Sequence, residues 1–121
     1  MIGMCVTGDL HELGAHMLCD LFEMEGWDTT YLGANVPIAS AVRMVRARKP
    51  QLVAISAAMS YHLSAVAQMI RAIREVEEFA PGKIIVGGNA FRVRDVWKRV
   101  GADGHANSAA DALIMAMKLV R

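Results

Sequence analysis

Hydrophobic residues form two kinds of pattern along this chain, and segments with one pattern alternate with segments with the other. Short apolar runs such as Gln51 to Ser56 and Lys83 to Val86 are typical of strands buried inside a parallel sheet. The stretches between them repeat apolar residues every three or four positions, which indicates amphipathic helices. In chain order, the predicted strands are residues 2–6, 27–32, 51–56, 83–86 and 102–104, and the predicted helices are residues 13–25, 38–49, 63–73, 92–100 and 109–120.

Turn and cap residues support these boundaries. Pro37 is placed to start the second helix, and Lys49-Pro50 ends it, because a residue before proline disfavours the helical conformation. Ser108 is suited to cap the final helix through its hydroxyl. Methionines at helical spacing, such as Met17 and Met24, are expected to fill the core. Five strands alternating with five helices predict an α/β fold, an open five-stranded parallel sheet with helices on both faces.

Composition limits the alternatives. With 121 residues, 55% of them hydrophobic and 21% charged, the chain is expected to form a single domain over residues 1–121. We find no membrane-length apolar run and no signal peptide, and the two cysteines, Cys5 and Cys19, are expected to be buried reduced thiols. These features favour a cytoplasmic protein. The net charge of +1 gives no attraction toward nucleic acid or membranes, so neither is expected as a partner.

Three short pieces at predicted strand ends carry the candidate chemistry. Residues 9–14, Asp-Leu-His-Glu-Leu-Gly, follow the first strand and have the pattern D-x-H-x-x-G. Ser56-Ala57-Ala58 closes the third strand, with 41 residues between it and Gly14. Gly87-Gly88 follows the fourth strand, with 28 residues between it and Ala58. Because ligands of open α/β sheets bind outside the carboxyl ends of the strands, the three pieces are expected to share one site.

The residue types in these pieces suit a bulky metal-containing ligand. A neutral imidazole such as that of His11 is a good ligand for a transition metal, and Asp9 could accept a hydrogen bond from the other ring nitrogen. The glycines permit a large ligand to approach the backbone closely. Each feature also has a simpler interpretation: a surface histidine beside a helix-start aspartate, and ordinary glycine turns between strand and helix.

In order and spacing, the three pieces resemble the D-x-H-x-x-G … S-x-L … G-G signature of cobalamin (vitamin B12)-binding domains. That family includes domains of methionine synthase, corrinoid methyl carriers, mutases and B12-dependent photoreceptors. The resemblance covers nearly the whole chain and implies a Rossmann-like (flavodoxin-like) fold with cobalamin as cofactor. It also implies base-off/His-on binding, in which His11 is the lower axial ligand of cobalt; the upper ligand is not implied. Ala58 departs from the family pattern, which usually has leucine there.

The resemblance implies a set of cofactor-binding residues. Ser56 is expected near the nucleotide tail of the cofactor, and side chains at the glycine positions would block that tail. His62 stands where the family often has Ser or Thr in a hydrogen-bond relay with Asp9; a solvated first-turn histidine is the alternative. The full set is Asp9, His11, Glu12, Leu13, Gly14, Gly33, Ser56, Ala58, Met59, Ser60, His62, Val86, Gly87 and Gly88, with His11 as the metal ligand. His105, after the last predicted strand, is expected at the surface.

The cofactor carries the chemistry in such domains, so we expect no enzymatic activity from this chain on its own. The chain begins too close to the first motif to contain a cap over the upper face of the corrinoid, so a cap domain or partner protein is expected. Two roles compete: a sensory or regulatory module, and a methyl-group carrier that serves methyltransferases. Residues 31–37 and 56–62 look closer to regulator-associated domains, which favours the first. A receiver domain without cofactor shares the fold class but would need an acidic cluster that is absent apart from Asp9.

Overall fold

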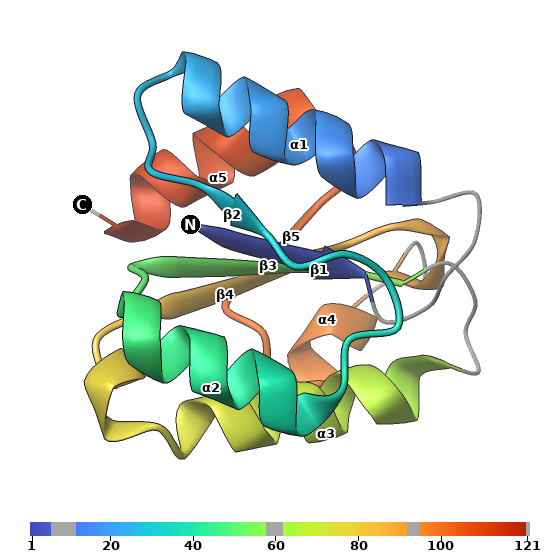
Figure 1. Ribbon diagram of the computed structural model, residues 1–121. Coiled ribbons are helices and arrows are strands. Elements are labelled where there is room, and N and C mark those ends of the chain that lie inside the picture. The colour runs from blue at the N-terminus through green and yellow to red at the C-terminus, as the bar shows by residue number, and fades with distance from the viewer. Residues whose placement is uncertain (6–11, 58–61, 92–94, 121) are drawn as a thin grey trace.

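The computed structural model describes residues 1–5, 12–57, 62–91 and 95–120, with only the backbone at residues 12–15 and 89. Five parallel strands form one sheet in the order β2-β1-β3-β4-β5, with helices on both faces (Figure 1). The predicted α/β architecture is therefore confirmed. In chain order the elements are β1 (Ile2–Cys5), α1 (Glu12–Met24), β2 (Thr30–Tyr31), α2 (Ile38–Arg48), β3 (Leu52–Ser56), α3 (Leu63–Arg74), η2 (Glu77–Phe79), β4 (Lys83–Gly87), η3 (Asn89–Phe91), α4 (Val96–Arg99), β5 (Gly104–Ala106) and α5 (Ala109–Val120).

Some element boundaries differ from the prediction. The second strand was expected over residues 27–32, but only Thr30–Tyr31 pair with β1, at the edge of the sheet. The last strand forms at Gly104–Ala106 rather than at 102–104. One reason is that Asp103 uses its side chain, which accepts a hydrogen bond from the Ile84 backbone N–H at 2.8 Å, to close the loop before the strand. Helix α4 spans only Val96–Arg99 of the expected 92–100, and residues 92–94 lie outside the described ranges.

The two faces of the sheet carry two separate cores. Helices α1 and α5 cover one face, and α2, α3 and α4 cover the other (Figure 1). The core under α2 and α3 is the larger and contains long side chains that are almost completely buried, including Ile73, Phe79 and Phe91. The core under α1 and α5 is smaller and rich in alanine; its buried members are Met1, Cys19, Phe22, Leu52, Ala54, Ile85, Ala106, Ala112 and Ala116.

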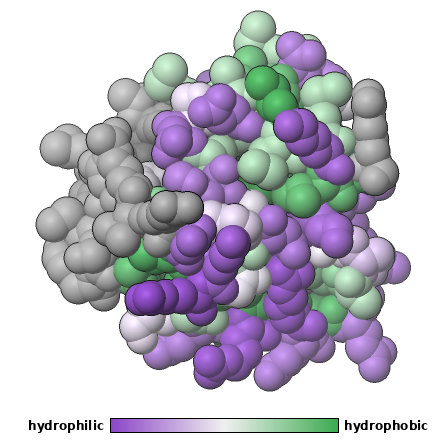
Figure 2. Space-filling view, turned by 180° about the vertical axis from the view of Figure 1, so that it is seen from behind, coloured by the Kyte–Doolittle hydropathy of each residue, from purple (hydrophilic) through white to green (hydrophobic). Residues whose placement is uncertain are grey.

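The outer surfaces of the two layers also differ. The expectation that the methionines fill the core is wrong for Met17 and Met24 of α1, whose exposed fractions are 59% and 82%, and for Met117 of α5 at 43%. These side chains leave the core because they lie on the outward stripe of their helices. Seen from behind, apolar residues gather in the upper layer, while hydrophilic residues cover most of the lower layer (Figure 2). No helix within the described ranges is long and apolar enough to cross a bilayer.

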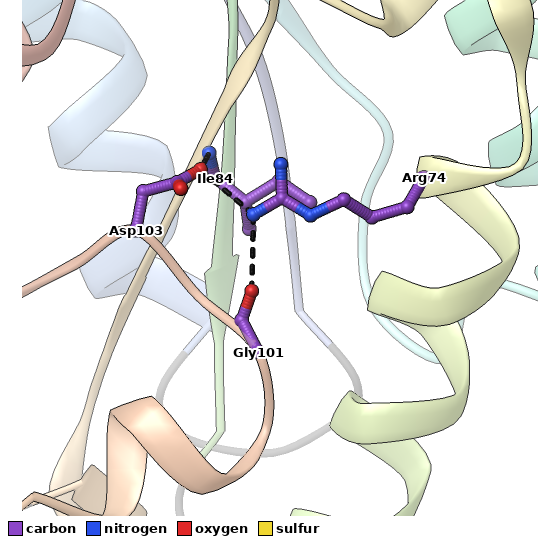
Figure 3. A network of polar contacts seen from close by, with 4 residues as sticks. All are labelled: Arg74, Ile84, Gly101 and Asp103. Carbon is purple, nitrogen blue, oxygen red and sulfur yellow. Dashed lines mark hydrogen bonds and ion pairs between the residues drawn. The ribbon is translucent and has the colours of Figure 1, made fainter.

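A polar network closes the amino edge of the sheet (Figure 3). The Arg74 guanidinium, at the end of α3, donates hydrogen bonds to the Gly101 carbonyl at 3.0 Å and to the Asp103 carboxylate at 2.7 Å. The same Asp103 oxygen accepts the hydrogen bond from the Ile84 N–H of β4. The network therefore ties α3 and β4 to the loop that enters β5. It lies at the opposite edge of the sheet from the strand ends that carry the sequence motifs.

Candidate functional site

The register of the sheet aligns four strand ends in one row. Cys5 of β1 pairs with Ser56 of β3, Ser56 pairs with Gly87 of β4, and Gly87 pairs with Ala106 of β5. The chain leaves β1 at Cys5 and enters α1 at Glu12, so the segment that contains the D-x-H-x-x-G motif starts and ends at this edge. Ser56 and Gly87, which come from two of the three sequence pieces, are therefore neighbours at the carboxyl edge of the sheet, whereas Asp9 and His11 of the first piece lie outside the described residues.

A cavity of about 200 Å³ lies beside this row, between the sheet and helices α1 and α5. The sheet contributes Gly3, Ala54 and Ile85 to its lining, α1 contributes Leu18, and α5 contributes Ala112. An apolar cavity of about 150 Å³ is large enough to hold a benzene ring. The space is therefore suited to a flat aromatic group, such as the base at the end of a nucleotide tail.

Polar side chains lie where the cavity meets the strand ends. Ser56 of β3 is half-buried, whereas Asn107 and Ser108, which lead into α5, are exposed. The Ser108 hydroxyl accepts a hydrogen bond from the backbone N–H of Asp111 at 3.1 Å, which confirms its predicted role as the cap of α5. None of the described lining residues is charged. The cavity thus combines an apolar interior with a few neutral hydrogen-bonding groups, a donor set that fits the tail of a cobalamin.

Gly87 and Gly88 line the cavity, but the structure gives Gly88 a different reason to be glycine. Its φ is +99°, and an added Cβ would collide with the Ala57 carbonyl oxygen. Ala57 donates its N–H to the Gly87 carbonyl at 3.1 Å and accepts a hydrogen bond from the Ala90 N–H at 3.2 Å. Backbone therefore packs on backbone at this turn. That a side chain at Gly88 would block the tail stays a prediction, and such a side chain would also disrupt the turn itself.

The loop after β2 lies at the same edge, without lining the cavity. The Gly33 carbonyl accepts a hydrogen bond from the Cys5 N–H at 2.9 Å, so this loop holds the last described residue before the first motif. Gly33 has a φ of +99°, which favours glycine. The Tyr31 hydroxyl, from the adjoining strand, also contacts the Cys5 sulfur at 3.9 Å. Gly33 is thus placed to position the motif loop rather than to touch a ligand in the cavity.

Several predicted site residues lie outside the described ranges. These are Asp9, His11, Ala58, Met59 and Ser60, so their assignments stay predictions. Glu12, Leu13 and Gly14 form the first turn of α1, and Val86 lies in β4, where it lines the cavity. Within the described part of the chain, no three His, Cys, Asp or Glu side chains gather into a metal-binding cluster.

The two remaining histidines of interest differ from the simplest expectations. His62 precedes α3, is half-buried, and lies at the carboxyl edge of the sheet, so it is not a fully solvated residue. His105 is not a surface residue, because it lies within β5 and is half-buried. Its Nε2 is buried without a hydrogen-bond partner among the described residues, and its ring lies 6.5 Å from that of Phe91. Phe91 belongs to the core of the opposite face, so His105 points away from the cavity.

The two cysteines are buried thiols that form no disulfide with each other, as predicted. Cys19 of α1 belongs to the core beside the cavity. Burial, together with the smaller effect of the nearby carboxylates of Asp20 and Glu23, raises the pKa of its thiol from 9.0 to about 11. The thiol is therefore protonated at neutral pH and is a poor nucleophile. We therefore expect no reaction at the Cys19 sulfur as part of the function of this site.

Part of the cavity was not predicted from the sequence. Its lining includes residues of β5 and the start of α5, namely Ala106, Asn107, Ser108, Ala109 and Ala112. One signal was available: Asn107-Ser108 follows a strand, at the same edge as the other motif pieces. The two-residue error in placing the last strand concealed this, and small apolar residues such as alanine give no signal of their own.

Comparison with known proteins gives a family match for this chain. A family model described as the B12 binding domain matches residues 1–114. A trimethylamine corrinoid protein from Methanosarcina barkeri is 32% identical over 108 residues, which make up 89% of this chain and 49% of that protein. The chain spans about half the length of the curated relatives that it matches.

Solved structures share the fold. A cobalamin-binding protein from Desulfitobacterium hafniense DCB-2 superposes with a TM-score of 0.86 and 27% identity, over 99% of this chain and 58% of that one. The methanol:cobalamin methyltransferase complex MtaBC from Methanosarcina barkeri contains a chain that superposes with a TM-score of 0.78 and 23% identity, over 98% of this chain and 45% of that one. At that identity, the second match shows the fold alone.

Proposed function

This chain belongs to the B12-binding domain family and its cofactor is cobalamin, and we propose that it is the corrinoid-carrying part of a methyl-group carrier. The observation that carries the proposal is the similarity to a trimethylamine corrinoid protein, 32% identical across 89% of this chain. In this role the chain presents the corrinoid to partner methyltransferases, one of which loads the methyl group and another of which removes it.

The sequence alone favoured a sensory or regulatory module, and the relatives favour the carrier instead. Corrinoid proteins for trimethylamine and for dimethylamine are among the matches, with 26–32% identity over 108–116 residues. One chain of the methanol:cobalamin methyltransferase complex MtaBC shares this fold, and the partner that we propose for this chain is likewise a methyltransferase. Such a partner would cover the upper face of the corrinoid during methyl transfer.

The residues proposed to hold the cofactor come from the first sequence motif and from the row of strand ends. His11 would be the lower ligand of cobalt, and Asp9 would hold its imidazole in the required tautomer. The cavity beside Ser56 and Gly87 would receive the nucleotide tail, which the His11 side chain displaces from the metal. When bound, cobalamin supplies a cobalt centre that can accept and release a methyl group. The protein would contribute binding and orientation, and the proposal includes His62, which precedes α3, as a member of the hydrogen-bond relay.

Reconstitution with hydroxocobalamin tests the ligand assignment. The wild-type protein should retain one corrinoid through gel filtration, with an absorption spectrum changed by imidazole ligation. The His11→Ala variant should lose that spectral change and bind more weakly, since the cobalt loses its protein ligand. His16→Ala is the matched control, because His16 is an exposed histidine of α1 that does not line the cavity. Identical spectra and retention for wild type and His11→Ala would contradict the assignment.

A transfer assay separates the carrier from the sensor. The loaded, reduced protein is incubated with a labelled methylamine and a methylamine methyltransferase. A carrier should acquire label on its corrinoid and lose it when a thiol acceptor and its methyltransferase are added. If the corrinoid stayed unlabelled with every methylamine supplied, the carrier role would be contradicted and the sensory role would be favoured instead.

A further inference from the structure

Among the described residues, the cavity has few groups for a hydrogen bond away from the strand ends. Its lining there includes Leu18, Ala54, Ile85 and Ala112, whose side chains are all apolar. Met4, Ile55 and Val86 also line it, but their side chains belong to the core of the opposite face, so here they contribute backbone. That backbone is engaged in the sheet, because β3 pairs with β1 on one side and with β4 on the other.

Polar side chains are confined to the carboxyl edge. Ser56 is the one polar side chain that the sheet contributes to the described lining, and it is half-buried. Asn107 and Ser108 are exposed, and the Ser108 hydroxyl already accepts the capping hydrogen bond from Asp111. A group that enters the cavity from this edge therefore meets the half-buried Ser56 hydroxyl and the exposed Asn107 amide at the rim, and then, among the described residues, apolar walls.

Natural corrinoids differ in the base at the end of the nucleotide tail, and these bases differ in polarity. Dimethylbenzimidazole has one ring nitrogen free to accept a hydrogen bond, and the rest of its surface is apolar. Adenine, the base of pseudocobalamin, has an exocyclic amine and several free ring nitrogens. A polar group buried without a partner costs free energy, because it loses its hydrogen bonds to water.

We infer that this cavity makes the chain selective for corrinoids that carry a benzimidazole base over those that carry adenine. One ring nitrogen matches one serine hydroxyl, and the methyl groups match the alanine and leucine walls. Adenine would leave several polar groups buried against apolar side chains. The inference rests on the proposed function, because the base reaches the cavity only when His11 has displaced it from cobalt.

Equilibrium titration of the cofactor-free protein tests the selectivity. Three corrinoids are compared by absorption and by tryptophan fluorescence: cobalamin, pseudocobalamin and cobinamide, which lacks the nucleotide. Cobalamin should bind about tenfold or more tightly than pseudocobalamin, the ratio expected when a single buried polar group loses its partner. Cobinamide should also bind more weakly than cobalamin, since it cannot fill the cavity.

The outcomes separate this inference from the proposed function. Equal affinity for cobalamin and pseudocobalamin, with the His11-dependent spectrum present for both, would overturn the selectivity and leave the carrier role intact. Equal affinity for cobalamin and cobinamide would show that the tail does not occupy the cavity, which also overturns the inference. Failure of all three corrinoids to give the His11-dependent spectrum would overturn the proposed binding mode and the selectivity with it.

A pair of serine variants locates the discrimination. Ser56→Ala should weaken cobalamin binding several-fold and leave cobinamide binding unchanged, because only the base loses its hydrogen-bond partner. Ser64→Ala is the matched control, since Ser64 is an exposed serine of α3 that does not line the cavity. An equal loss of cobalamin and cobinamide binding in Ser56→Ala would show that Ser56 does not contact the base.

Discussion

The two faces of one sheet are packed to different degrees, although the same five strands form both. Under α2 and α3, long side chains such as Ile73, Phe79 and Phe91 fill the space and are at most 1% exposed. Under α1 and α5, alanines such as Ala54 and Ala112 leave a cavity of about 200 Å³. Protein interiors are normally close-packed, so a cavity of this size marks a place for a ligand. One face is filled by the core, and the other contains the cavity that we propose for the nucleotide tail.

Enlarging one buried alanine on each face of the sheet should produce the largest difference between the two faces. Ala112 and Ala41 are both buried helix residues that face the sheet, but only Ala112 lines the cavity. Ala41→Leu should lower the free energy of unfolding by about 1–3 kcal/mol, because the added methyl groups enter a filled core. Ala112→Leu should change stability less and should lower the affinity for cobalamin by more than about tenfold, since the side chain occupies the space of the base. Urea denaturation and corrinoid titration measure the two effects.

Two further alanines of α5 serve as controls for that experiment. Ala116 is fully buried in the same helix but does not line the cavity, so Ala116→Leu should behave like Ala41→Leu. Ala110 is exposed, so Ala110→Leu should leave both stability and binding unchanged. Normal cobalamin affinity in a folded Ala112→Leu protein would show that the tail lies elsewhere.

The polar network at the amino edge of the sheet joins α3, on the densely packed face, to the loop that enters β5. It lies at the opposite edge of the sheet from the cavity. Asp103→Ala removes the carboxylate that accepts hydrogen bonds from Arg74 and from the Ile84 N–H. The side chains of Arg74 and Asp103 are 35% and 26% exposed, so solvent weakens the ion pair, and a loss of about 1–2 kcal/mol is expected. Cobalamin affinity should not change.

Asp103→Asn should recover part of this loss, since its amide oxygen can still accept from Ile84. The exposed Arg46–Glu78 pair, at 3.6 Å, is a control for ordinary surface charge, and Glu78→Ala should cost no more than about 0.5 kcal/mol. If Asp103→Ala proved no more costly than Glu78→Ala in urea denaturation, the network would contribute no more than a surface ion pair.

The smallest expected effect concerns pH and the thiol beside the cavity. Burial raises the pKa of Cys19 from 9.0 to about 11, so the folded state favours the neutral thiol. The associated stability is fully present below about pH 9 and is lost as pH rises from there toward 11, because only the unfolded chain ionises in that range. Cys19→Ala should flatten this part of the stability curve measured by urea denaturation. An unchanged slope would mean that Cys19 ionises alike in both states.

Predictions from the sequence succeeded where the signal is local. The hydrophobic period located β3, β4 and α3 within one or two residues, and Ser108 caps α5 through the expected hydroxyl. They failed where a neighbour from elsewhere in the chain decides the outcome. The Asp103 carboxylate accepts hydrogen bonds from Arg74 of α3 and from Ile84 of β4, and β5 begins after it, later in the chain than predicted. Gly88 is glycine because an added Cβ would collide with the Ala57 carbonyl.

From the sequence alone we could predict the α/β class, the open parallel sheet and the motif pieces at the strand ends, because periodicity and turn residues act over a few neighbouring positions. The sequence also identified the glycine pair at residues 87 and 88, but not the Ala57 carbonyl oxygen that an added Cβ at Gly88 would meet. The alignment of Cys5, Ser56, Gly87 and Ala106 in one row could be established only from the folded structure, since strand register depends on strands that are far apart in the chain. Only the tertiary structure made a cavity, because a space between small side chains exists only where β3, β4, α1 and α5 face one another.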